Sequence, residues 1–271
     1  MELQGKVALV LGAIKGIGKG IGLALAKRGV TVALNYFDWE DELDGLKKDF
    51  AATGQEHLIV QTNLLEVEKI PDLISRVIER YSRLDILINN IERGGWPVVH
   101  GAYVPQQWDL EMQTTLRAKQ WIFESALPHL KATGNGVVIN LSSIAALVGR
   151  SGPAGPVFND GYAAANRGIS LLTETWARLA APEVRVNEIM LGFVETRHAQ
   201  KTRGWGLLTA DQKQALLDHT LLQRTGTIED VVKTALFIIK DAPFITGSVL
   251  RLDGGYVLGG EKVGQMPQGV L

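Results

Sequence analysis

A glycine-rich turn near the start of the chain has the residue types and spacing of a phosphate-binding loop. The apolar run 7–11 ends at Gly12, and Gly16 and Gly18 follow just before an amphipathic stretch. This order predicts a strand, a turn and a helix. Glycine lets the backbone approach a ligand closely, and the N–H groups at a helix start attract a pyrophosphate. We therefore predict a dinucleotide site; a turn without a ligand is the alternative.

Other residue types that support catalysis or metal binding are sparse. The chain has no cysteine, which excludes disulfides and thiolate metal sites, and its five histidines form no metal-ligand pattern with carboxylates. His100 and His198 fall in or near loops expected to border the site, where either could act as an acid or a base. A polar surface role is the alternative for both. We therefore predict no metal site.

The elements that must position such a site follow from the apolar pattern. Strand-like runs are expected at 7–11, 31–36, 57–61, 84–89, 137–142, 184–190 and 248–252, with helical patterns between most of them, for example at 66–81, 108–130 and 162–181. The last helix is expected to turn Ile169, Leu172, Trp176 and Leu179 inward. This alternation predicts an α/β fold: one Rossmann-like, doubly wound parallel sheet of about seven strands with helices on both faces.

Composition narrows the class of protein. The 271 residues are 46% hydrophobic and carry a net charge of -1, so a single domain over residues 1–271 is expected, with no electrostatic reason to bind nucleic acid. The first residues lack the pattern of a signal peptide, and no apolar run is long enough to span a bilayer. We expect a cytoplasmic protein that acts on small molecules, with no nucleic acid or membrane as partner.

Several short motifs follow the glycine turn along the sequence. They are Asn89-Asn90 and Ser142-Ser143 at strand ends, Tyr162 at a helix start, Arg185-Val186-Asn187, and Asp253-Gly254-Gly255. In their order and spacing the chain resembles the short-chain dehydrogenases/reductases nearly from end to end. It is most similar to the 3-oxoacyl-carrier-protein reductase branch.

The resemblance implies roles for four residues. A serine at the position of Ser143 polarises the substrate carbonyl, and a tyrosine at the position of Tyr162 transfers a proton while nicotinamide transfers hydride. The family lysine four residues after the tyrosine is replaced by Asn166, and the family asparagine of the preceding helix is replaced by Thr115. Two of the four catalytic positions therefore depart from the family pattern.

The missing lysine has a large expected effect. A unit charge ~4 Å from a developing phenolate is worth ~4 kcal/mol at an effective dielectric near 20, or ~3 pKa units. Without it, Tyr162 is expected to stay protonated at neutral pH, with slow turnover in both directions, while Asn166 hydrogen-bonds the cofactor ribose. Arg167 lies about 100° further round the helix and is expected to face elsewhere. Glu92 would either bind ribose hydroxyls or point to solvent.

The resemblance also implies the cofactor. Tyr36 stands where relatives that use NAD(H) have an acidic residue, and Lys15 matches the basic residue that relatives using NADP(H) place against the 2′-phosphate. NADP(H) is therefore favoured, with NAD(H) as the alternative because Asp38 is close to the strand end. The expected cofactor-binding residues are Gly12, Lys15, Gly16, Ile17, Gly18, Tyr36, Asn63, Leu64, Asn90, Tyr162, Asn166, Val194 and Thr196.

Substrate and assembly are the remaining expectations. A substrate lid is expected around residues 192–220, and its basic residues would attract an acidic carrier or a coenzyme A thioester, a solvated loop being the alternative. Trp96 and Trp205 would line a pocket or anchor loops. The family implies a homotetramer or homodimer that pairs the helices at 108–130 and 162–181. The tail, residues 257–271, would cover a neighbouring site or fray.

These expectations lead to two hypotheses. The first is an NADP(H)-dependent oxidoreductase that reduces a carbonyl, in a 3-oxoacyl thioester or a ketone, to an alcohol by hydride transfer at an atypical active site. The alternative is a catalytically impaired dinucleotide-binding pseudoenzyme that acts as a partner subunit or redox sensor. Asn166 and Thr115 are the residues that separate the two.

Overall fold

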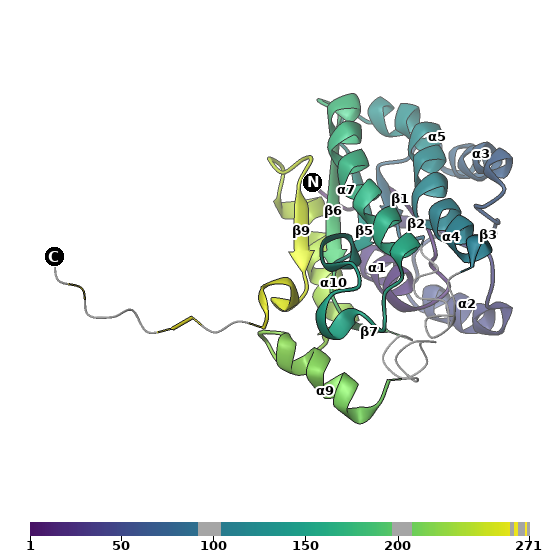
Figure 1. Ribbon diagram of the computed structural model, residues 1–271. Helices are drawn as coiled ribbons and strands as arrows, with labels where there is room; N and C mark the ends of the chain where they lie inside the picture. Colours follow the sequence, from purple (N-terminus) through teal and green to yellow (C-terminus); the bar gives the residue numbers. More distant parts are fainter. Residues whose placement is uncertain (92–103, 197–207, 261–262, 265–268, 270–271) are drawn as a thin grey trace.

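A seven-stranded parallel sheet forms the centre of the protein in the computed structural model, which describes residues 1–91, 104–196, 208–260, 263–264 and 269 (Figure 1). The strand order is β3-β2-β1-β4-β5-β6-β9, and every neighbouring pair is parallel. The strands are β1 (Val7–Val10), β2 (Thr31–Tyr36), β3 (His57–Gln61), β4 (Ile86–Asn89), β5 (Gly136–Ser143), β6 (Val184–Leu191) and β9 (Val249–Leu252). The predicted doubly wound fold is confirmed.

Helices cover both faces of this sheet. On one face lie α1 (Gly16–Ala26), α2 (Leu43–Ala51), α10 (Ile228–Leu236) and a π-helical turn, Phe237–Asp241. The other face carries α3 (Ile70–Tyr81), α5 (Ala118–Ala132) and α7 (Asp160–Ala180). Shorter elements are α4 (Pro105–Glu111), α6 (Ala145–Val148), α9 (Ala210–His219), the strand pair β7 (Val194–Glu195) with β8 (Gly226–Thr227), and 3-10 turns at Glu40–Glu42, Val67–Lys69, Gly152–Ala154 and Tyr256–Leu258.

Burial of the strands explains their apolar sequences. All residues of β1, β4 and β5 are buried, because a parallel sheet covered on both faces leaves its central strands no contact with water. The edge strand β9 instead alternates exposed and partly buried residues. The carboxyl ends of the central strands, where the motifs lie, are therefore held in a rigid frame.

Asp85 ties two of these strands together at their amino ends. Its carboxylate accepts a hydrogen bond of 2.9 Å from the Val7 N–H and two from Arg83, and it lies 3.3 Å from the Lys6 ammonium. Burial alone raises the pKa of Asp85, but these hydrogen bonds and charges outweigh it and hold the pKa below its ordinary value.

The helix expected at 108–130 is interrupted. Between α4 and α5 the backbone forms a π-helical stretch, Met112–Arg117. In a regular α-helix, side chains four residues apart differ in direction by ~40° around the helix axis, because four residues make slightly more than one turn. The wider π turn compensates for this rotation. As a result Gln107, Glu111, Thr115 and Lys119, spaced four apart, are all buried.

Two expectations about the region around α7 need correction. The side chain of Asn159 caps the helix by accepting a hydrogen bond from the Tyr162 N–H, so the helix begins before Tyr162. Leu179 is 56% exposed, and its predicted inward orientation is wrong. The buried stripe passes through Trp176 and Ala180, and the neighbouring position points about 100° away from it.

Candidate active site

The sequence motifs meet at the carboxyl ends of the strands, beside the point where the strand order reverses between β1 and β4. There the Asn90 side chain donates a hydrogen bond of 3.1 Å to the Gly12 carbonyl. In open α/β sheets a ligand binds in the crevice at this switch point. The candidate site is therefore built across β1, β4 and β5.

The glycine turn has the shape that a dinucleotide requires. A Cβ atom on Gly12 would lie 2.3 Å from the Asn90 carbonyl oxygen, and one on Gly18 would lie 2.4 Å from the Gly12 carbonyl oxygen. Gly12 and Gly16 both have φ +60, which glycine adopts readily. The N-cap residue of α1, Lys15, makes no side-chain cap hydrogen bond. The first turn of α1 thus offers its N–H groups to an anion, and these residues fit a pyrophosphate.

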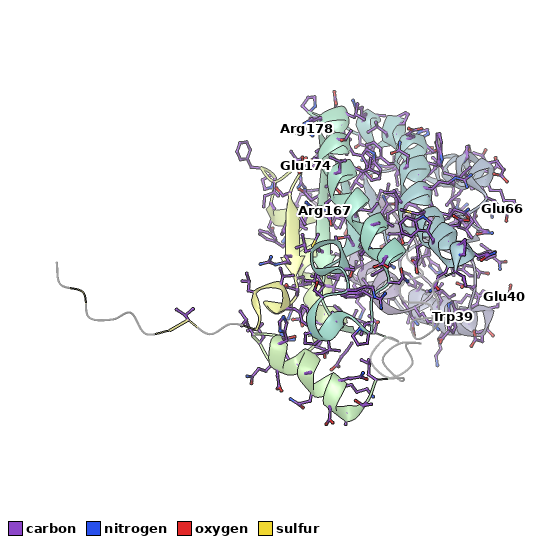
Figure 2. The ribbon with its side chains drawn as sticks, in the orientation of Figure 1. Trp39, Glu40, Glu66, Arg167, Glu174 and Arg178 are labelled. Atoms are coloured by element: carbon purple, nitrogen blue, oxygen red, sulfur yellow. The ribbon has the colours of Figure 1, made fainter. Side chains whose placement is uncertain are left out.

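The Lys15 side chain is held over an aromatic ring at the edge of the crevice that follows β1. Its ammonium lies 3.1 Å from the centre of the Trp39 ring and 3.6 Å from the Glu42 carboxylate. Tyr36 ends β2 close by in sequence and is buried. Figure 2 shows Trp39 beside α2. Sequence reasoning missed Trp39, since nothing in the pattern showed that it would stack on Lys15.

The outer cofactor-binding candidates follow the carboxyl ends of other strands. Asn63 and Leu64 follow β3, and Asn63 bonds the Leu65 N–H and the Glu66 carboxylate. Val194 lies in β7, and its carbonyl accepts a hydrogen bond of 2.8 Å from the Thr196 N–H. Contact of these residues with a cofactor stays a prediction.

Asn166 joins the two proposed catalytic residues. Its Oδ1 accepts a hydrogen bond of 3.1 Å from the Ser143 backbone N–H, and its Nδ2 donates one of 3.0 Å to the Tyr162 carbonyl. The side chain has no exposed surface. We expected Asn166 to face the ribose, but the structure directs its amide to two backbone groups. Asn166 therefore links the end of β5 to the first turn of α7.

The Ser143 and Tyr162 side chains lie in a mostly apolar environment. The Ser143 hydroxyl accepts a hydrogen bond of 3.1 Å from the Ala145 N–H, which leaves its hydrogen to be donated elsewhere. Tyr162 is only 7% exposed, and its ring lies 6.0 Å from that of Phe158. Phe158 in turn stacks on Phe193. Such surroundings strengthen hydrogen bonds to a developing charge.

The Thr115 side-chain hydroxyl reaches no hydrogen-bonding partner in the described part of the chain, although the residue is fully buried. One turn earlier, Glu111 accepts a hydrogen bond of 3.3 Å from the Asn159 side chain, which caps the turn that carries Tyr162. Sequence reasoning missed Glu111, although a carboxylate among the apolar positions of a helix was an available signal.

Other candidates are separated from this site or lie outside the described residues. Arg167 is exposed on α7, as expected, in line with Glu174 and Arg178 (Figure 2). Glu92, Trp96, His100, Arg197, His198, Lys201, Arg203, Trp205 and most of the tail lie outside the described residues. In the portion that is described, no group of three His, Asp or Glu side chains could hold a metal ion.

Comparison with known proteins identifies the family. The family model described as enoyl-(acyl carrier protein) reductase matches residues 12–257. The chain belongs to the short-chain dehydrogenase/reductase family. It is therefore an oxidoreductase by family, and the seven-stranded parallel fold agrees with that membership.

Relatives within this family cover almost the whole chain. The 3-oxoacyl-[acyl-carrier-protein] reductase FabG of Thermotoga maritima is 30% identical over 262 residues, covering 95% of this chain and 100% of its own. FabG of Staphylococcus epidermidis is 30% identical over 254 residues, covering 92% of this chain and 98% of its own. A crystal structure of a putative short-chain alcohol dehydrogenase from Sinorhizobium meliloti has a TM-score of 0.83 at 27% identity and covers 95% of this chain and 98% of its own.

Among the residues that the structure describes, no helix combines the length and the apolar character needed to cross a bilayer.

Proposed function

We propose that this protein is an NADP(H)-dependent reductase that converts a carbonyl group, in a 3-oxoacyl thioester or a ketone, to an alcohol. The observation that carries the proposal is the link from Ser143 through Asn166 to Tyr162, beside a glycine turn that fits a pyrophosphate. The names of the FabG relatives support the substrate class.

Each residue of the site has a distinct task in this proposal. A bound nicotinamide would supply the hydride. The Ser143 hydroxyl, whose oxygen already accepts from the Ala145 N–H, donates a hydrogen bond to the substrate carbonyl oxygen. The Tyr162 hydroxyl donates the proton to that same oxygen. The aromatic side chains around Tyr162 limit the access of water.

Asn166 determines how efficient this chemistry is. It supplies no charge, so the Tyr162 phenolate formed after proton transfer lacks the ~4 kcal/mol of stabilisation that a lysine ~4 Å away would give. It contributes instead by fixing Ser143 relative to Tyr162. We propose a slow reductase in which the geometry of the site is retained and its cation is lost.

Lys15 supports NADP(H) as the cofactor. Its ammonium lies at the edge of the crevice after β1, and Trp39 and Glu42 restrict its position. A fixed cation at this edge favours a phosphate on the adenosine ribose. NAD(H) is the alternative cofactor, and its binding is to be compared with that of NADP(H).

The test is NADPH oxidation at 340 nm with a panel of ketones and 3-oxoacyl thioesters. The native protein is expected to turn over at least one class, and Tyr162→Phe is expected to lower kcat at least about 100-fold. Arg178→Ala, an exposed change on the same helix, is the matched control. No effect of Tyr162→Phe on a measurable rate would refute the mechanism.

The alternative is a pseudoenzyme that binds the dinucleotide as a partner subunit or redox sensor. The fully buried Asn166 amide, engaged with backbone on both sides, favours it, since Asn166 carries no charge where the family has a lysine. Binding of NADPH without turnover in the whole panel would support this alternative. A large rise in turnover with Asn166→Lys would identify a degraded reductase.

The exposed apolar side chains of α5 and α7 support a homodimer or homotetramer. Trp121, Leu171 and Leu179 are 43%, 66% and 56% exposed, and a groove is lined by Met112 of the π-helical stretch and Leu172 of α7. Monomeric proteins rarely expose such patches. We propose that a second copy covers this face.

A further inference from the structure

Two oppositely charged residues are completely buried beside the end of β5 that carries Ser143. Lys119 on α5 and Glu188 on β6 have no exposed surface, and each lies among the buried residues of its element. Burying an isolated charge is very unfavourable, so such groups need partners. Neither residue belongs to the proposed catalytic set.

The partners of both residues converge on the end of β5. The Lys119 ammonium donates a hydrogen bond to the Leu141 carbonyl. The Glu188 carboxylate accepts hydrogen bonds from the Ser142 hydroxyl and, over 3.0 Å, from the Ser170 hydroxyl. Leu141 and Ser142 are the two residues directly before Ser143.

Electrostatics relates the two charges. Burial raises the pKa of Glu188, while the hydroxyls of Ser142 and Ser170 and the charges of Lys119 and Arg167 act in the opposite direction. The charge of Lys119 thus partly offsets the cost of burying the Glu188 carboxylate. Two buried charges of this kind add little stability compared with apolar residues of the same volume, so stability alone does not explain their presence.

We propose that Lys119 and Glu188 are positioning residues that hold the end of β5 so that Ser143 faces the substrate. Asn166 restrains the Ser143 N–H from the side of α7, and the buried pair restrains the two preceding residues from below. Ser170, which bonds Glu188, lies one helical turn beyond Asn166. The catalytic part of this inference rests on the proposed function.

The test compares Lys119→Met, Glu188→Leu and the double variant with the native protein. Each single change removes one of two buried charges that partly offset each other, so both are expected to lower the urea midpoint strongly. The double variant is expected to have a urea midpoint close to that of the native protein. It should nevertheless lose about tenfold in kcat at unchanged KM, because a misplaced catalytic group slows the chemical step.

Hydrogen–deuterium exchange supplies a readout that needs no turnover. A peptide covering residues 141–148 is expected to exchange about tenfold faster in the double variant than in the native protein, measured where their global stabilities match. The matched control is Glu174→Leu with Arg178→Met, an exposed pair on α7 whose loss should change neither readout. Ser142→Ala, which removes one bond to Glu188, is a milder variant with the same expected direction.

The outcomes separate the two proposals. A double variant with native exchange and native kcat would overturn the positioning role and leave a purely structural pair. If the double variant does not fold, native exchange in Ser142→Ala decides against the role in the same way. If the native protein reduces no carbonyl, the proposed function fails, and faster exchange at 141–148 still supports positioning by the pair.

Discussion

Replacing Asn166 by alanine is predicted to destabilise the protein by about 3 kcal/mol. The change leaves the buried Ser143 N–H without its acceptor, which costs about 1–3 kcal/mol. The lost hydrogen bond to the Tyr162 carbonyl adds about 0.5–1 kcal/mol, and the small void left in a fully buried position adds a similar amount. The sum is a large part of the stability of a typical domain, about 5–15 kcal/mol.

Urea unfolding followed by tryptophan fluorescence measures this loss. Arg178→Ala, an exposed change on the same helix, is the control and should stay within about 0.5 kcal/mol of the native protein. Because Ser143 loses one restraint, kcat should fall in Asn166→Ala as well. A free energy of unfolding within 0.5 kcal/mol of the native value would show that Asn166 does not hold Ser143, and it would restore the expectation that this amide faces the ribose.

Three further predictions concern other parts of the molecule. Asp85→Asn should lower the free energy of unfolding by about 2 kcal/mol above pH 5. Because folding lowers the pKa of Asp85, the stabilisation that its carboxylate provides is lost as the pH falls below about 4. A difference between variant and native protein that stays constant from pH 7 to pH 3 would contradict this. Lys15→Met should weaken NADPH binding about tenfold and NADH binding less than twofold in calorimetric titration, with Lys27→Met as the control; equal effects on both cofactors would exclude a phosphate contact. Leu171→Arg should shift the mass in sedimentation equilibrium toward the monomer, and an unchanged mass would place the interface elsewhere.

The fold and the location of the site could be predicted because they depend on regular patterns. Apolar runs and helical periods determine a parallel sheet, and the glycine turn marks its first crossover. The positions of Gly12, Asn90 and Ser143 at strand ends follow directly from that pattern. Sequence reasoning also predicted that Arg167 would face away from the site, because neighbouring helical positions point in different directions.

The interactions of individual side chains could not be predicted in the same way. Asn166 has polar groups that suit a ribose or a backbone equally well, and only the three-dimensional distance to the Ser143 N–H decides between them. Lys119 and Glu188 stand among other polar residues in the sequence, and their partners come from elements distant in sequence. Leu179 was predicted inward because it fits an approximate helical period, whereas the actual stripe passes one residue away.

The π-helical stretch Met112–Arg117 makes the site sensitive to chain length. Because this wider turn contains one residue more than an α-helical turn would, it resembles an insertion that the helix has absorbed. Removing a single residue there would let the helix become regular and would rotate everything before it by about 100° relative to α5. Glu111 would then leave its place beside Asn159 while Lys119 stayed below β5. A deletion that spares every proposed catalytic residue could thus separate the cap of α7 from its support.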